Sequence, residues 1–362
     1  MGAIRLFLAL VVAVGHLRML MLTPAGINTL PNIELGINAG FAVMFFYMIS
    51  GFLISTGLTE KYPSTPAGAL RFYEGRLVRI FSLYWPVLLL TFAVHNLWSW
   101  FGALSSIDKF TNVFIIGVDW RILFADYPGW HWDASPQYLH QAWTLGAELV
   151  FYLLAPFILR SWKVAMSLLL LSAAIRLAIV STTPFDGRMM YLFLPSTLVF
   201  FLIGHFVQLL SLRWLWIRSG RIGLLFLACS WLWLRDGTAT WDGFRFWAAV
   251  ICFAAALPGI FSSTKDSARW NALGDLSYPV YLLHIVVMVK LMDFKLLERL
   301  PYPPLLITAV YLAVVIVSAI AVHWLLERPT AALMRSCFRL FRRTRTRLFP
   351  VKPPAVDAPS AT

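Results

Sequence analysis

The sequence predicts an all-α integral membrane protein, a bundle of about ten transmembrane helices whose N- and C-termini both lie in the cytoplasm. The first observation behind this prediction is composition: 60% of the residues are hydrophobic and 13% are charged, whereas soluble domains carry about 25% charged residues. The second is the length of the apolar runs, which approach the roughly 20 residues that a helix needs to cross a bilayer. Helices also satisfy their own backbone hydrogen bonds in lipid.

The apolar runs divide the chain into ten segments joined by shorter polar connections. The seventh segment is short, and the fifth contains Arg176. We expect a transmembrane domain over residues 1–330 and a basic, partly disordered cytoplasmic tail over residues 331–362. The ten predicted helices cover residues 4–22, 38–58, 81–101, 141–160, 164–181, 190–210, 221–235, 244–261, 276–293 and 304–326.

The third observation is where the cations lie. With the N-terminus inside, the cytoplasmic connections and the tail hold 20 of the 30 Lys and Arg residues, which is the positive-inside pattern of a multi-pass protein. A juxtamembrane basic tail binds anionic lipids of the inner leaflet. The net charge of +13 therefore needs no nucleic-acid partner to explain it.

The first helix carries two polar residues, Arg5 and His16, in an otherwise apolar run. Their eleven-residue spacing is close to three helical turns, so both side chains lie on nearly the same face, about 16 Å apart along the axis. An ionisable group at that depth in a membrane indicates a functional site. The alternative is a histidine that forms an ordinary hydrogen bond between helices.

Two further positions suit an anionic ligand on the cytoplasmic side. Arg76 and Arg79 are three residues apart and thus neighbours on one helix face, where two guanidinium groups suit a polyphosphate. Contacts with lipid headgroups are the alternative.

The Ser50-Gly51 pair allows another backbone or a ligand to approach the helix closely. Helix packing through small residues explains the pair equally well.

The fourth helix contains a carboxylate, Glu148, about two turns after its start. A carboxylate there must find a partner, be protonated or face water, and the sequence leaves Arg176 and His16 open as partners. In the ninth helix, the stripe of Tyr278, Tyr281 and His284 is interpreted as a structural hydrogen-bond network. The three cysteines have no metal-like spacing, so no metal site is expected.

The long outer connection, residues 102–140, is rich in aromatic and polar side chains. Such residues suit a sugar, whose apolar faces stack on rings, or else they form an interfacial aromatic belt. The candidate acceptor-binding residues in it are Trp130, Trp132, Asp133 and Tyr138.

Six motifs in order resemble acyltransferase family 3, membrane proteins that O-acetylate bacterial surface polysaccharides, lipopolysaccharide, Nod factors and some small molecules. The first is Arg5 with His16. The others are AVMFFYMISGFLI (Ala42–Ile54), RLVRIFSLYWP (Arg76–Pro86), AWTLGAELVFYLLAP (Ala142–Pro156), LGDLSYPVYLLH (Leu273–His284) and LLERP (Leu325–Pro329).

The resemblance implies a bacterial inner-membrane enzyme of ten helices that takes acetyl-CoA from the cytoplasm, without a metal. It implies that His16 is the essential histidine, with Arg5 as its partner. Arg76 and Arg79 match the cytoplasmic arginine pair. The Ser-Gly-Phe element is matched by Ser50, Gly51 and Phe52.

The chain departs from the family pattern at Met44, where many members carry an acidic residue. Some members also append an extracytoplasmic esterase-like domain, for which we expect no room here. The acceptor, a glycan or glycolipid, would then be handled by the membrane domain or by a separate protein.

The resulting hypothesis is transfer of an acyl group, expected to be acetyl, to an acceptor hydroxyl outside the cytoplasm. Arg76, Arg79 and Arg5 would hold the coenzyme A phosphates, and the pantetheine arm would bring the thioester to His16, the general base. Glu148 is the second candidate catalytic residue. The alternative function is a non-catalytic polysaccharide flippase or transporter, although the sequence shows no convincing inverted repeat.

Overall fold

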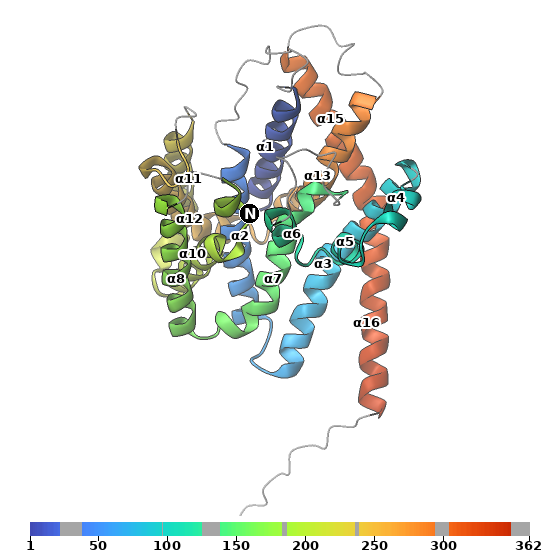
Figure 1. Ribbon diagram of the computed structural model, residues 1–362. Helices are drawn as coiled ribbons and strands as arrows, with labels where there is room; N and C mark the ends of the chain where they lie inside the picture. The colour runs from blue at the N-terminus through green and yellow to red at the C-terminus, as the bar shows by residue number, and fades with distance from the viewer. Residues whose placement is uncertain are drawn as a thin grey trace, which may run out of the picture.

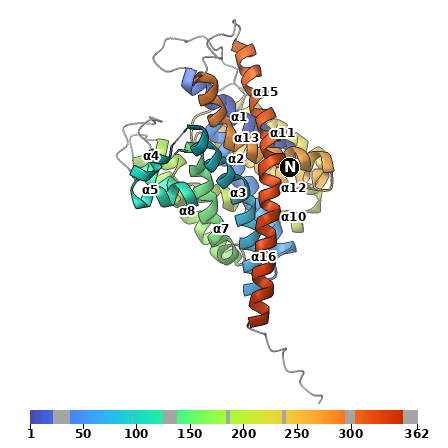
Figure 2. The same cartoon turned by 90° about the vertical axis from the view of Figure 1, so that its right-hand side faces the viewer.

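The computed structural model describes residues 1–21, 38–95, 97–124, 138–182, 187–235, 239–293 and 304–348. Within these residues every regular element is a helix, which confirms the predicted fold class. Figures 1 and 2 show the long helices gathered into one bundle, from which α16 projects.

The helices come in the following order along the chain. They are α1 (Gly2–Met21), α2 (Ala39–Glu60), α3 (Pro66–His95), α4 (Trp98–Ala103), α5 (Ser106–Phe114), α6 (Val118–Phe124), η1 (His140–Ala142), α7 (Trp143–Ile158), α8 (Trp162–Thr182), α9 (Gly187–Tyr191), α10 (Leu194–Arg213), η2 (Leu215–Arg218), α11 (Gly220–Leu234), α12 (Phe244–Thr264), α13 (Ala268–Asp293), α15 (Pro304–Val322), η3 (His323–Glu327) and α16 (Arg328–Leu348).

Each of the ten predicted segments overlaps one of these helices. Among the described residues, eight helices are long and apolar enough to cross a membrane, while Gly2–Leu17 and Gly220–Leu234 are shorter apolar helices. The protein is therefore an all-α integral membrane protein. The count of ten spans and the cytoplasmic location of both ends stay predictions.

The third predicted helix differs from the structure at both ends. It was expected at residues 81–101, but α3 begins at Pro66 and ends at His95. Helix α3 packs against α16, and Glu74 in its polar first half pairs with Arg342 of α16. The predicted tail, residues 331–362, begins within α16, which ends at Leu348. Residues 349–362 lie outside the described residues, so the partly disordered character of the tail stays a prediction.

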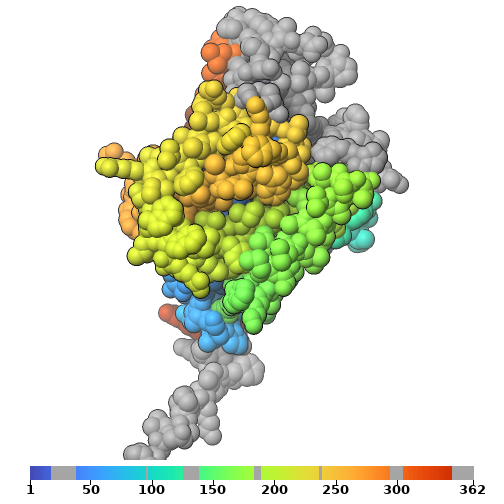
Figure 3. All heavy atoms as spheres, turned by 90° about the vertical axis from the view of Figure 1, so that its left-hand side faces the viewer, coloured from blue at the N-terminus to red at the C-terminus, as the bar shows by residue number. Residues whose placement is uncertain are grey.

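Helix α2 lies at the centre of the bundle. It packs against α1 and α10, and α1 in turn packs against α13. In the apolar window of α2, 72% of the residues are buried, compared with 22% for α8. Figure 3 shows the peripheral face to which α8 (green), α11 (yellow) and α12 (gold) contribute. Its exposed apolar side chains, which suit contact with lipid, include Leu170, Leu171, Leu177, Leu224, Leu225 and Leu232.

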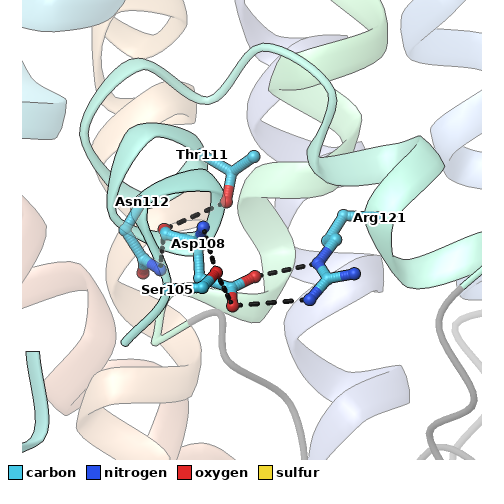
Figure 4. Close-up of polar contacts among 5 residues, drawn as sticks. All are labelled: Ser105, Asp108, Thr111, Asn112 and Arg121. Carbon is cyan, nitrogen blue, oxygen red and sulfur yellow. Dashed lines mark hydrogen bonds and ion pairs between the residues drawn. The ribbon is translucent and has the colours of Figure 1, made fainter. Parts of the chain in front are cut away.

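The connection between α3 and α7 contains the short helices α5 and α6, joined by an ion pair. Nε of Arg121 lies 2.8 Å from Oδ1 of Asp108, and Ser105 Oγ donates to Asp108 Oδ2 at 2.6 Å (Figure 4). Burial raises the pKa of Asp108, but these hydrogen bonds outweigh burial and hold the pKa below its ordinary value. The polar face of α5 is thus turned inward, whereas Ile107 and Phe110 are exposed.

A different ion pair, buried on both sides, fixes α8. Arg176, with only 2% of its surface exposed, lies with Nε 2.6 Å from Oδ1 of Asp242. Its Nη1 donates to the carbonyl of Met190 at 2.9 Å, and its guanidinium carbon lies 4.9 Å from the centre of the Phe200 ring. Arg176 is therefore paired with Asp242, although its buried Nη2 has no hydrogen-bond partner among the described residues, and it is not the partner of Glu148.

Candidate functional site

One cavity brings together side chains from α1, α2, α3, α7 and α13. The space inside it, counted together with the open solvent at its mouth, is about 890 Å³. Five of the predicted site residues line it, namely Arg5, Ser50, Arg76, Arg79 and Glu148. The other polar and aromatic lining residues are Phe46, Tyr47, Thr144, Tyr152, Ser277, Tyr278 and Tyr281.

Three arginines face this cavity. The guanidinium carbon of Arg76 lies 5.6 Å from the centres of both the Phe72 and Tyr152 rings, and its buried Nε has no hydrogen-bond partner among the described residues. Arg79 lies 5.6 Å from the centre of the Tyr278 ring. Aromatic faces hold guanidinium groups without neutralising them, so the cavity keeps a positive charge.

Glu148 supplies the one carboxylate among the described lining residues. Its Oε1 accepts a hydrogen bond from Ser50 Oγ at 2.5 Å and another from the hydroxyl of Tyr152, one turn later on α7. These two hydroxyls are its hydrogen-bond partners, in place of the Arg176 and His16 that the sequence left open. Glu148 thereby links α2 to α7 at the cavity wall.

Tyrosines form much of the remaining wall. Tyr281 OH lies 2.7 Å from Thr144 Oγ1, and Tyr278 OH donates to the carbonyl of Ile80 at 2.8 Å. Tyr47 OH is buried without a hydrogen-bond partner among the residues that the structure describes. A buried hydroxyl of this kind costs free energy unless a ligand or a water satisfies it.

His16 does not line the cavity. Its Nδ1 lies 3.0 Å from the carbonyl of Val12 and 3.1 Å from Nε2 of His284. Nδ1 of His284 lies 2.6 Å from the carbonyl of Tyr281, which does line the cavity. The histidine pair is therefore joined to the cavity wall through Tyr281.

These contacts fix the tautomer of both rings when they are neutral. A carbonyl oxygen only accepts, so Nδ1 of His284 carries a proton and its Nε2 is an acceptor. Nδ1 of His16 faces two acceptors and must also carry a proton. The lone pair of neutral His16 is then on Nε2, the atom that can take a proton from a hydroxyl.

The Ser-Gly-Phe element divides between two roles. Ser50 faces the cavity, but a Cβ atom on Gly51 would lie 1.8 Å from the carbonyl oxygen of Phe201 on α10. Phe52 is buried, and its ring centre lies 5.4 Å from that of Phe261. Neither Gly51 nor Phe52 lines the cavity, and the structure gives both a role in helix packing. Their predicted role in cofactor binding stays untested.

Of the predicted acceptor-binding residues, Trp130, Trp132 and Asp133 lie outside the described residues. Tyr138 is half-buried, and its ring centre lies 6.3 Å from that of Phe92 and 6.1 Å from that of Trp100. It belongs to an aromatic group on α3 and α4 and does not line the cavity.

Three residues with contacts at or beside the site, Tyr152, His284 and Glu327, were not predicted as site residues from the sequence. Tyr152 follows Glu148 by one turn, a spacing that could have identified it as a partner. His284 was assigned to a structural network, although it contacts His16. Glu327, in the LLERP motif, lies with Oε1 3.8 Å from Nη1 of Arg79, a contact that no sequence signal shows.

Comparisons with known proteins agree with the resemblance. Residues 1–324 match the model of the family Acyl_transf_3, described as an acyltransferase domain. The chain is also 29% identical over 279 residues to Nodulation protein 10 of Rhizobium leguminosarum bv. viciae, an alignment covering 68% of this chain and 71% of that relative. No solved structure gives a significant match. The chain belongs to acyltransferase family 3 and is a membrane acyltransferase, not the transporter held as the alternative.

Proposed function

We propose that the protein moves an acyl group from cytoplasmic acyl-CoA to a hydroxyl of an extracytoplasmic acceptor, with His16 as the general base. The observation that carries this proposal is the charge of the cavity: three arginines line it, and Glu148 is the one carboxylate among its described lining residues. Guanidinium groups bind phosphate oxygens in pairs and do not lose their charge. Coenzyme A is a soluble acyl carrier with that polyanionic character.

The cavity wall suits the rest of such a donor. Beside the arginines it is lined by aromatic rings and hydroxyls, among them Tyr278 and Tyr281 from α13 and Ser50 from α2. Glu148 accepts from Ser50 and Tyr152 and so keeps both hydroxyls at fixed positions. In the proposal this wall guides the pantetheine arm from the arginines towards His16.

The chemical step needs one base. The acceptor oxygen attacks the thioester carbonyl, Nε2 of His16 takes the hydroxyl proton, and the carbon–sulfur bond breaks. The imidazolium then returns the proton to the thiolate, which leaves free coenzyme A and an ester of the acceptor. General-base catalysis of this kind contributes about 10²- to 10⁴-fold to a rate.

The donor group is proposed to be acetyl and the acceptor a glycan or glycolipid in the outer half of a bacterial inner membrane. An aromatic group formed by Phe92, Trp100 and Tyr138 supports the acceptor class, because sugars stack on rings.

On the cytoplasmic side, Arg335, Arg339 and Arg343 are exposed at four-residue spacing along α16. They form a face that suits anionic lipid headgroups.

Binding of coenzyme A to the full chain in nanodiscs tests the donor site. Arg76→Gln should raise the dissociation constant by at least about tenfold, because a charge-assisted hydrogen bond is lost. Arg160→Gln is the matched control, since Arg160 is exposed and donates to the carbonyls of Tyr62 and Pro63 outside the cavity. Equal affinities for wild type and Arg76→Gln would refute the donor site.

Turnover by the same preparation tests the base. Release of the coenzyme A thiol, followed with acetyl-CoA and a glycan acceptor, should fall at least about 100-fold in His16→Ala. Coenzyme A binding should stay at the wild-type value because His16 does not line the cavity. Near-normal turnover by His16→Ala would rule out His16 as the base.

A further inference from the structure

The long C-terminal helix contains a local irregularity beside the donor cavity. Between α15 and α16, residues His323–Glu327 form the π-helical segment η3. Single π-turns of this kind are rare and are found frequently at functional sites. Both end residues of the segment are buried, His323 with 9% and Glu327 with 6% of its surface exposed.

Glu327 links the π-turn to the cavity, because its carboxylate contacts Arg79 of α3. Oε2 of Glu327 lies 2.7 Å from Nδ1 of His323, which holds the carboxylate in place. Oε1 of the same carboxylate lies 3.8 Å from Nη1 of Arg79. Arg79 lines the cavity, whereas Glu327 and His323 do not.

We propose that Glu327, held by His323, is a positioning residue that fixes Arg79 in its donor-binding orientation. The inference rests on the proposed function, in which Arg79 binds a phosphate of acyl-CoA. A free arginine side chain loses rotational freedom when it binds a ligand, and holding it beforehand lowers that cost. One contact at 3.8 Å, together with the Tyr278 ring, orients the guanidinium and leaves other N–H donors to bind a ligand.

The chain supplies its own comparison. A second ion pair joins α3 to α16, which continues directly from η3, with Nη1 of Arg342 on α16 lying 3.2 Å from Oε2 of Glu74 on α3. Neither Arg342 nor Glu74 lines the cavity. If both ion pairs only attach the C-terminal helix to α3, loss of either pair should change the KM for the acyl donor equally. If Glu327 positions Arg79, only the loss of Glu327 should raise that KM.

The experiment compares Glu327→Gln, Glu74→Gln, Arg79→Gln and the double variant of Glu327 and Arg79 in nanodiscs. We expect Glu327→Gln to raise the KM for acetyl-CoA about fivefold with kcat unchanged at saturating donor. The double variant should be no worse than Arg79→Gln alone, because the two residues act through one group. Glu74→Gln should keep the wild-type KM. His323→Gln, which removes the support of Glu327, should raise KM in the same direction by less.

Three results would overturn the inference. An unchanged KM in Glu327→Gln, with a raised KM in Arg79→Gln, would reject the positioning role and leave the donor site intact. An equal increase in Glu74→Gln would show that helix attachment is what matters. An unchanged KM in Arg79→Gln itself would remove Arg79 from the donor site, which is a failure of the proposed function.

Discussion

Nε2 of His284 on α13 lies 3.1 Å from Nδ1 of His16 on α1, although the two residues are 268 positions apart. The ring centres are 5.0 Å apart. Because Nδ1 of His284 is engaged by the carbonyl of Tyr281, His284 presents a hydrogen-bond acceptor to His16. This pairing turns the basic nitrogen of His16 away from His284.

Loss of His284 should therefore lower kcat, because His284 holds His16 in its active tautomer. His284→Leu removes the acceptor, and we expect kcat to fall about tenfold while the donor KM stays unchanged. His284→Gln offers an amide oxygen to His16 and should retain more activity. The measurement is kcat across pH 6 to 9, since the wrong tautomer changes the pH profile as well as the rate. Equal losses in both variants, with an unaltered profile, would indicate a packing role alone.

Glu148 should oppose donor binding by its charge. Glu148→Gln keeps an oxygen that accepts from Ser50 and Tyr152 but removes the negative charge among the three arginines. We expect the dissociation constant of coenzyme A to fall about threefold at low ionic strength. Glu60→Gln, at the exposed end of α2, is the control and should change nothing. Weaker binding in Glu148→Gln would mean that the carboxylate supports the ligand site directly.

Gly51 should matter for stability. The new methyl group of Gly51→Ala would meet the backbone of Phe201, so α2 and α10 must separate, at a cost of about 1–3 kcal/mol. On the same helix, Gly57→Ala meets a tyrosine ring at 3.6 Å, an ordinary contact. Thermal unfolding in detergent should show a lower Tm for Gly51→Ala and a Tm at or above wild type for Gly57→Ala. A normal Tm with lost donor binding would instead support the role in cofactor binding predicted from sequence.

Asp119 in α6 should make stability depend on pH. Burial raises the pKa of Asp119 from 3.8 to about 6, and the nearby backbone amides of Trp120 and Asp119 offset only part of this rise. The folded protein thus holds this proton more tightly than the unfolded chain. Stability is complete below about pH 4, falls as pH rises towards 6 and stays lower above it, by up to about 3 kcal/mol.

Asp119→Asn should accordingly raise Tm at pH 7.5 and change it little at pH 4.5. Asp108 provides the opposite case, because its lowered pKa means that its ionised form stabilises the fold above its ordinary pKa and this stabilisation is lost in acid. Asp108→Asn should lower Tm at pH 7.5. A Tm of Asp119→Asn that matches wild type at both pH values would contradict the burial argument.

The helical bundle was well predicted because the length of an apolar run and the charges that flank it are local properties of the sequence. Each apolar run near 20 residues became a helix, and Arg76 and Arg79 lie on one face of α3 as their spacing requires. The start of α3 was missed because its first half is polar. That half pairs with α16 through Glu74 and Arg342, a contact between residues far apart in the chain that the sequence does not reveal.

The site was only partly predictable for a related reason. In a membrane helix both the lipid-facing and the buried sides are apolar, so periodicity gives little information about which face packs. The sequence therefore could not assign Gly51 to helix packing and Ser50 to the cavity. It also could not pair His16 with His284 or Arg79 with Glu327, because both pairs depend on the tertiary arrangement of α1, α3, α13 and η3.

The buried pair of Arg176 and Asp242 makes α8 and the segment before α12 depend on each other for stability. Loss of either side chain alone leaves the other charge in a site with almost no access to water, which typically costs about 3–5 kcal/mol. A single substitution at either position should therefore destabilise the fold, even though the pair lies apart from the arginine cavity. Replacing both residues together by apolar side chains leaves no unpaired charge and should cost less than either change alone.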